Sequence, residues 1–160
     1  MKKLAIASLI ILALTGCAKE IDYSQKQVRN GIVYTVNADT PFTGKVVDKY
    51  SNGQKKLVEK FKDGKFDGEQ VYYYENGQIE DKIDYKLGEP IGKYYSYHRN
   101  GEIAYTGEFL NGKKNGNWDR YTEDKKLILT EVYENGELKD VKQYLVDTEK
   151  LKNKLNNLFN

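Results

Sequence analysis

The chain has 160 residues, with 26 basic and 24 acidic side chains, one histidine, one cysteine and a formal net charge of +2. This balance argues against the concentrated basic face that nucleic-acid binding usually requires, so we expect no nucleic-acid partner. A single cysteine excludes an intrachain disulfide. Because hydrophobic residues make up only 39% of a chain that contains 14 tyrosines, aromatic rings must supply much of the apolar contact. The length fits one domain.

Residues 1–16 are typical of a secretory signal peptide. Lys2 and Lys3 precede an apolar run, Leu4 to Leu14, that is too short to span a membrane. The run leads into a four-residue motif: Leu14, Thr15, Gly16 and Cys17. This motif resembles the lipobox of bacterial lipoproteins, in which the cysteine receives a diacylglycerol on its sulfur and becomes the first residue after cleavage. The alternative is a short apolar anchor with an incidental cysteine.

The lipobox resemblance implies that the protein is located in the bacterial cell envelope. The lipid on Cys17 would hold the mature N-terminus on a membrane. In enterobacterial lipoproteins an aspartate after the cysteine retains the protein in the inner membrane, and here Ala18 stands in that place. The resemblance therefore implies the outer membrane if the envelope is Gram-negative. Removing Lys2 and Lys3 leaves equal numbers of basic and acidic side chains, so electrostatic docking on anionic lipid is not expected.

Two segments precede the main part of the chain. Residues 17–28 are polar, and we interpret them as a lipidated tether. Residues 29–43 are expected to form N-terminal capping strands, because Asn30-Gly31 is a turn signal and Ile32 to Tyr34 are strand formers.

Residues 44–139 repeat every 24 positions, four times, without an insertion or deletion. Three glycine series show the period: Gly44, Gly68, Gly92 and Gly116; Gly64, Gly88, Gly112 and Gly136; and Gly53, Gly77 and Gly101. The third series follows asparagine, and Asn-Gly favours a two-residue type I′ turn with positive φ at both positions. The series that begins at Gly64 marks the turn into the next unit. A fixed period of this length predicts a small unit stacked on its own copies.

Equivalent positions in the four units predict the buried face. One set of equivalent positions is wholly aromatic: Phe61, Tyr85, Phe109 and Tyr133. Another set is wholly polar: Lys45, Glu69, Lys93 and Asn117. Apolar and polar columns fall on opposite faces of a pleated strand. We therefore expect an all-β fold, an elongated single-layer twisted antiparallel sheet of β-hairpin repeats with an aromatic ladder across its strands.

Residues 140–160 are predicted to form a C-terminal cap. The position at which a fifth unit would begin is Asp140 and not glycine, so the array is expected to end before it. Asp147 or Thr148 can N-cap a short helix. Four apolar residues would share one face of that helix: Leu151, Leu155, Leu158 and Phe159. We expect this helix to cover the last strand edge, which would otherwise pair with another chain, and we expect a monomer.

The repeat unit resembles the MORN-type repeat of bacterial proteins. Its pattern is G-x-x-x-x-Tyr-x-x-Asn-Gly-x-[Ile/Leu], followed by aromatic-x-x-Gly-x-x-x-Gly, over residues 42–140. The resemblance implies an elongated, twisted, single-layer sheet. Some small lipoproteins with these repeats are labelled antitoxin components of toxin–antitoxin modules, so the resemblance also includes an antitoxin among the candidate roles.

No catalytic or metal-binding constellation stands out. His98 is the only histidine and precedes an Asn-Gly turn, where a hairpin-edge role is expected. Without a second histidine or a cysteine inside the domain, zinc sites and Ser–His or Cys–His pairs are not expected. The loop Asp63 to Gly68 lacks the alternating acids of a calcium loop. We expect no enzyme, no metal and no cofactor.

The tyrosines are the main candidates for binding. Tyr72-Tyr73-Tyr74 and Tyr94-Tyr95 place rings on both faces of a strand. One face would pack the ladder and the other would expose Tyr72 and Tyr95, and exposed tyrosines supply contact area at low entropic cost. The alternative is that the rings only cover the two sides of a thin sheet. We expect Tyr72, Tyr95 and Trp118 to bind a protein partner, with glycan or peptidoglycan as the alternative ligand.

Overall fold

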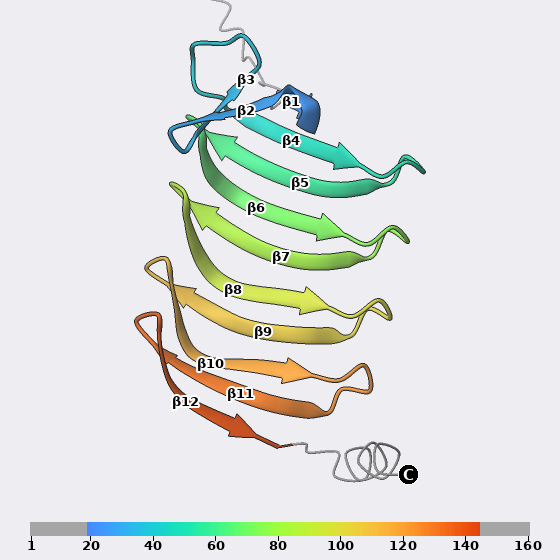
Figure 1. Cartoon of the computed structure of the whole chain (residues 1–160), viewed down its shortest axis with the longest axis vertical. Coiled ribbons are helices and arrows are strands. Elements are labelled where there is room, and N and C mark those ends of the chain that lie inside the picture. The colour runs from blue at the N-terminus through green and yellow to red at the C-terminus, as the bar shows by residue number, and fades with distance from the viewer. Residues whose placement is uncertain (1–18, 145–160) are drawn as a thin grey trace, which may run out of the picture.

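The computed structural model describes residues 19–144 and shows an all-β fold. A ten-stranded, single-layer sheet runs along the long axis, with a two-stranded sheet at its N-terminal end (Figure 1). The strands of the large sheet are β1 (Glu20–Asp22), β4 (Gly44–Lys49), β5 (Lys55–Lys62), β6 (Lys65–Tyr73), β7 (Ile79–Lys86), β8 (Glu89–Tyr97), β9 (Ile103–Leu110), β10 (Lys113–Tyr121), β11 (Leu127–Glu134) and β12 (Glu137–Gln143). The small sheet pairs β2 (Lys26–Arg29) with β3 (Ile32–Thr35), after a 3₁₀ turn, η1 (Tyr23–Gln25).

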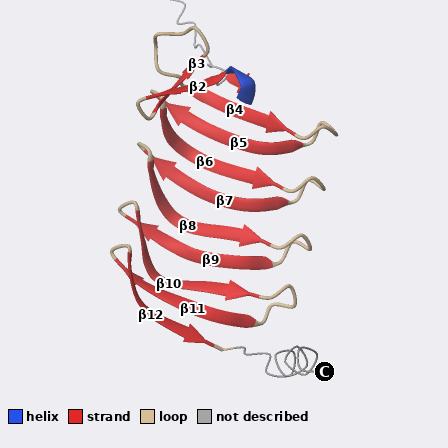
Figure 2. Cartoon of the chain, viewed as in Figure 1, coloured by secondary structure: helices blue, strands red, loops and turns tan. Residues whose placement is uncertain are grey.

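The strand order follows the chain. From β4 to β12 each strand is antiparallel to the next, so each unit contributes two strands joined by hairpin turns. Figure 2 shows the strands filling the sheet and the turns confined to its two long edges. The predicted sheet of hairpin repeats is confirmed.

The turn types differ from the prediction. At Asn52-Gly53 only the glycine has positive φ, at 83°. Backbone hydrogen bonds from Gly53 to Tyr50 (2.9 Å) and from Tyr50 to Gln54 (2.8 Å) close a three-residue loop. The asparagine side chain accepts from the backbone N–H of Gln54 at 2.9 Å, which stabilises a type I turn followed by a left-handed glycine. The predicted type I′ turn at this position is wrong.

The two-residue turns lie at the opposite edge of the array. Asp63 and Gly64 have φ of 49° and 75°, as a type I′ turn requires, and Lys62 pairs with Lys65 across it. In the fourth unit Lys125 replaces the glycine of the three-residue loop and still adopts φ 64°. The repeat therefore tolerates one strained position where its sequence pattern lapses.

The N-terminal segment is structured from Glu20 onward. β1 pairs in parallel with β4, and Ile21 is buried in a cluster with Phe42, Val46 and Phe61. Lys45 donates a backbone hydrogen bond to the carbonyl of Lys19 at 2.7 Å. The interpretation of residues 17–28 as a polar tether is therefore wrong for Glu20 and the residues after it. A single isoleucine among polar neighbours supplies the contact that fixes this segment.

The C-terminal end of the sheet also differs from the predicted end of the repeat array. β12 continues through Asp140 to Gln143, paired with β11, and all its residues are exposed. The sheet therefore continues to Gln143, beyond the predicted end of the array at residue 139. The predicted helix after Asp147 lies outside the described residues, as do the motif residues Leu14, Thr15 and Gly16 and the lipidation site Cys17. Within residues 19–144 no helix is long and apolar enough to cross a membrane.

The sheet has two chemically different faces. Residues that oppose one another across a strand pair share a face, so the register Leu57↔Tyr72 and Gln70↔Ile83 assigns the side chains. The face that we call the aromatic face carries Phe61, Phe66, Tyr72, Tyr85, Tyr94, Tyr105, Phe109, Trp118 and Tyr133. The other, which we call the polar face, carries Glu69, Lys82, Tyr95, Thr106, Asn117 and Asp119.

Candidate binding face

A lysine fills a site at the N-terminal end of the aromatic face. Lys26, on β2, places its Nζ 2.6 Å from Glu59 Oε2, with side-chain exposures of 12% and 4%. The same ammonium lies 5.3 Å from the ring centroid of Phe61 and 5.9 Å from that of Phe66. Glu59 also accepts from Gln70 Nε2 at 3.2 Å. We call Lys26, Glu59, Phe61 and Phe66 the N-terminal cation site.

A second lysine fills a site toward the C-terminal end. Lys114 Nζ lies 4.2 Å from the ring centroid of Trp118, 4.8 Å from that of Tyr133 and 5.1 Å from that of Tyr105. It donates to Tyr105 Oη at 3.0 Å, and this hydroxyl donates to Glu131 Oε2 at 2.5 Å. Burial lowers the pKa of Lys114, and Glu131 partly opposes that change. We call these five residues the C-terminal cation site.

Trp118 is the centre of the C-terminal site and is only 1% exposed. Its indole lies against Gly107 on β9, where a Cβ atom would come within 2.1 Å of Trp118 Cδ2. Glycine is therefore required at this position for steric reasons. The ring of Trp118 stacks on that of Tyr94, with the ring centroids 5.6 Å apart. The indole Nε1 is buried without a hydrogen-bond partner among the described residues.

A groove of about 330 Å³ lies on the aromatic face and extends into the C-terminal cation site. It is lined by Gln70, Tyr72, Asp81, Ile83, Tyr85, Tyr94, Tyr105, Phe109, Lys114 and Trp118. Tyr94 donates a hydrogen bond from its hydroxyl to Asp81. Burial raises the pKa of Tyr94 well above its ordinary range, and the hydrogen bond to Asp81 adds to the rise. The groove thus combines an aromatic floor with one carboxylate, Asp81, and one ammonium, Lys114.

The structure does not bring the three predicted anchors together. Tyr72 lines the groove and is 37% exposed, but it lies on the same face as the aromatic ladder, so its predicted place on the opposite face is wrong. Tyr95 pairs with Lys82 and Thr106, which places it on the polar face. Trp118 is only 1% exposed, so its side chain presents almost no surface to a partner, and its role as an anchor stays a prediction. Binding through Tyr72 or Tyr95 stays a prediction, and the two residues belong to different surfaces.

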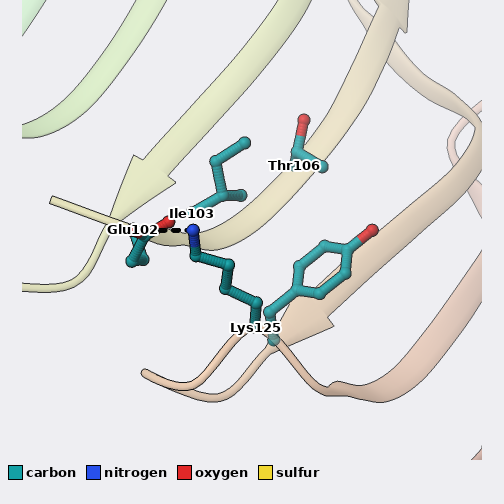
Figure 3. A pocket seen from close by; sticks show the side chains of 5 residues that line it. Glu102, Ile103, Thr106 and Lys125 are labelled. Atoms are coloured by element: carbon teal, nitrogen blue, oxygen red, sulfur yellow. Dashed lines mark ion pairs between the residues drawn. The ribbon is translucent and has the colours of Figure 1, made fainter.

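The polar face has two hollows of its own. One, of about 390 Å³, is lined by Lys93, Tyr95, Thr106, Gly107, Glu108, Asn115, Gly116, Asn117 and Asp119. A smaller one, of about 180 Å³, is lined by Ile103, Thr106 and Tyr121 beside an ion pair between Glu102 and Lys125 (Figure 3). Lys125 Nζ lies 3.0 Å from Glu102 Oε1. The pair links the third and fourth Asn-Gly-type loops at the unit where the glycine is lost.

A ladder of hydrogen bonds joins successive units at the edge of the sheet that carries the three-residue loops. The hydroxyls of Tyr50 and Tyr74 donate to the carbonyls of Tyr73 (2.6 Å) and Tyr97 (2.5 Å) in the following unit. His98 occupies the equivalent position, with its Nε2 2.9 Å from the carbonyl of Tyr121. Since a carbonyl only accepts, Nε2 carries the hydrogen. This donor role agrees with the hairpin-edge role that the sequence predicts for His98.

The sequence alone does not predict a role in these sites for four residues: Lys26, Asp81, Gly107 and Lys114. Gly107 had a usable signal, because it is a glycine inside a strand pattern and outside the three glycine series. The other three are charged residues that carry no local signal. Within residues 19–144 no group of three or more His, Cys, Asp or Glu side chains is placed to hold a metal ion.

Comparison with known protein families agrees with this architecture. Residues 66–87 and 90–111 match the MORN repeat variant, so the second and third hairpin units, β6–β7 and β8–β9, are repeats of this type. Most of the groove lies within them. No curated protein matches the chain.

Proposed function

We propose that this protein is a lipid-anchored binding protein of the bacterial cell envelope and that its aromatic face grips one protein partner. The groove carries this proposal. Tyr72 stands exposed above a floor of packed rings, with a carboxylate beside it. Large aromatic side chains around a desolvated centre are the composition found at the energetic centres of protein interfaces.

The anchor is part of the same proposal. The lipobox-like residues Leu14, Thr15 and Gly16 and the adjacent Cys17 support a lipid on the cysteine. The proposed location is the outer membrane if the envelope is Gram-negative. The proposed role is non-catalytic, since the clusters on both faces are explained by packing and hydrogen bonding.

One form of the proposal is that the partner is a toxin which this protein neutralises. The similarity of the repeats to those of lipoproteins that carry an antitoxin label supports this form. Neutralisation by binding needs only a surface that covers the toxin, and a long sheet face offers such a surface.

A second candidate is glycan binding by the polar face. Tyr95 stacks on Tyr97, with ring centroids 6.2 Å apart, and borders the hollow that contains Asn115, Asn117 and Asp119. Ring faces beside amide and carboxylate groups suit a ligand with apolar faces and many hydroxyls. In this case the protein would be a structural link between membrane and cell wall.

Crosslinked capture of the lipidated protein from its own cells separates the two candidates. We expect one dominant stoichiometric protein, lost in Tyr72→Ala and retained in Tyr95→Ala, because these residues lie on opposite faces. Cell-wall fragments that are lost only in Tyr95→Ala would support the glycan role. A diffuse background that is the same in all three proteins would contradict both.

A further inference from the structure

Three acid–aromatic sites lie along the aromatic face of the described chain, and two of them hold a lysine. At one end the ammonium of Lys26 contacts Glu59 directly. Toward the other end, Lys114 reaches Glu131 through the hydroxyl of Tyr105. Glu59 and Glu131 are equivalent positions three units apart. The same face therefore binds a lysine twice, once from β2 outside the array and once from β10 inside it.

The third site lies in the groove and has the same components without a cation. Asp81 accepts a hydrogen bond from Tyr94, just as Glu131 accepts one from Tyr105. Tyr72 and Tyr85 complete the surrounding rings. Among residues 19–144, Asp81 takes part in no ion pair. In the same part of the chain no lysine or arginine lies over the rings of these three tyrosines.

We propose that this third site binds a lysine or arginine side chain of the partner protein. The inference rests on the proposed function, because it names the chemistry by which the groove would recognise its partner. A carboxylate without a counter-ion attracts a cation, and ring faces add a further attraction. The two filled sites show within one molecule how this face receives such a side chain.

The neighbouring lysine does not block the site. Asp81 is on β7 and Lys114 is on β10, with two strands between them. At the usual strand spacing the two backbones are about 14 Å apart. Lys114 is also held by its own hydrogen bond to Tyr105. Lys114 lines the same groove, and Arg120 lies 4.7 Å from the ring centroid of Tyr105, but among residues 19–144 neither forms an ion pair with Asp81.

The direct test is a titration of the ¹⁵N-labelled protein with acetyl-Ala-Lys-Ala-amide, followed by NMR chemical shifts. The control peptide replaces lysine by norleucine, which keeps the aliphatic chain and removes the charge. We expect shifts centred on Asp81, Tyr72 and Tyr94, and an affinity at least about tenfold higher for the lysine peptide, equivalent to about 1.4 kcal/mol.

A matched pair of variants locates the charge. Asp81→Asn should weaken binding of the lysine peptide at least about tenfold, which is about 1.4 kcal/mol. Asp84→Asn makes the same change on the same strand, but residue 84 opposes Glu69 on the polar face, so affinity should not change. Equal affinity for the two peptides, or full affinity in Asp81→Asn, would overturn the proposal. The peptide comparison needs no variant and stands even if Asp81→Asn fails to fold.

The outcomes also separate this inference from the proposed function. If the lysine peptide does not bind, while Tyr72→Ala still abolishes capture of a dominant partner, the groove binds a protein by other contacts and this inference fails. If the peptide binds at Asp81 but no dominant partner is captured from cells, the inference stands and the proposed function fails.

Discussion

The two ends of the aromatic face hold a lysine in different ways. At the N-terminal site the cation comes from β2, outside the array, and makes a direct ion pair of 2.6 Å with Glu59. At the C-terminal site Lys114 comes from the array itself and contacts its carboxylate through Tyr105. The first site joins β2, outside the array, to the repeats, whereas the second joins only strands of the array to one another. The groove extends from Tyr72 to Lys114, and neither lysine forms an ion pair with its carboxylate, Asp81.

Breaking the C-terminal site should have the largest effect. Trp118→Ala removes the buried indole that packs against Gly107, and we expect a loss of about 4 kcal/mol in the free energy of unfolding. Urea denaturation measures it. Leu110→Ala is the control, since this side chain on the neighbouring strand is 53% exposed, and it should lose less than about 1 kcal/mol. Similar losses in both variants would show that Trp118 does not organise this end.

Breaking the N-terminal site should cost somewhat less. Lys26→Met leaves the buried carboxylate of Glu59 without its counter-ion, and we expect a loss of about 3 kcal/mol. The double variant Lys26→Met with Glu59→Gln removes both charges and should recover part of this loss. Lys62→Met, at an exposed position of β5, is the control and should change stability by less than about 0.5 kcal/mol. A double variant as unstable as Lys26→Met would contradict a paired role.

The groove on the aromatic face should respond to alkaline pH. Burial and Asp81 raise the pKa of Tyr94 above that of an unfolded tyrosine, about 10. A group with a raised folded pKa contributes stability below its unfolded pKa and loses it as pH rises toward the folded value. Stability should therefore fall above about pH 10, with a contribution from Tyr94 of no more than about 1.4 kcal/mol per pH unit. Tyr94→Phe should flatten this fall and leave the slope near neutral pH unchanged; an identical alkaline slope would contradict the assignment.

The ladder that joins the units should give the smallest effect. His98→Phe removes the hydrogen bond to the carbonyl of Tyr121, and we expect a loss of about 1 kcal/mol. His98→Tyr introduces the residue that donates at positions 50 and 74, so it should retain most of the stability. Thermal unfolding compares the two variants. A tyrosine variant that is no more stable than the phenylalanine variant would show that the ladder contributes little here.

Repetition made most of the fold predictable. A motif that recurs at a fixed period pairs with its own copies, so strand order, antiparallel pairing and the aromatic ladder follow from the columns of glycine and aromatic residues. Turn types did not follow, because the side chain of Asn52 makes a local hydrogen bond that the dipeptide rule does not include. The segment around Ile21 was missed because one buried isoleucine gives no periodic signal.

The candidate site was harder to predict, since it consists of exceptions to the repeat. Lys114 stands at the position occupied by Phe66 and Pro90 in other units, and Asp81 stands where Leu57 and Tyr105 stand. Residues that recur at one position of every unit give a sequence signal, whereas residues that occur there only once do not. Gly107 shows the same effect, because its equivalents are Glu59, Ile83 and Glu131. In this chain the common residues build the sheet and the exceptional ones shape the groove.

Photo-crosslinking from the two faces shows which of them binds the partner. Benzoylphenylalanine is placed at Tyr72 or at Tyr95 in the lipidated protein, cells are irradiated, and crosslinked peptides are sequenced by mass spectrometry. We expect position 72 to crosslink to a single protein through a peptide that contains lysine or arginine, and we expect no such crosslink from position 95. Crosslinks to one protein from position 95 alone would contradict the assignment of the aromatic face as the binding surface.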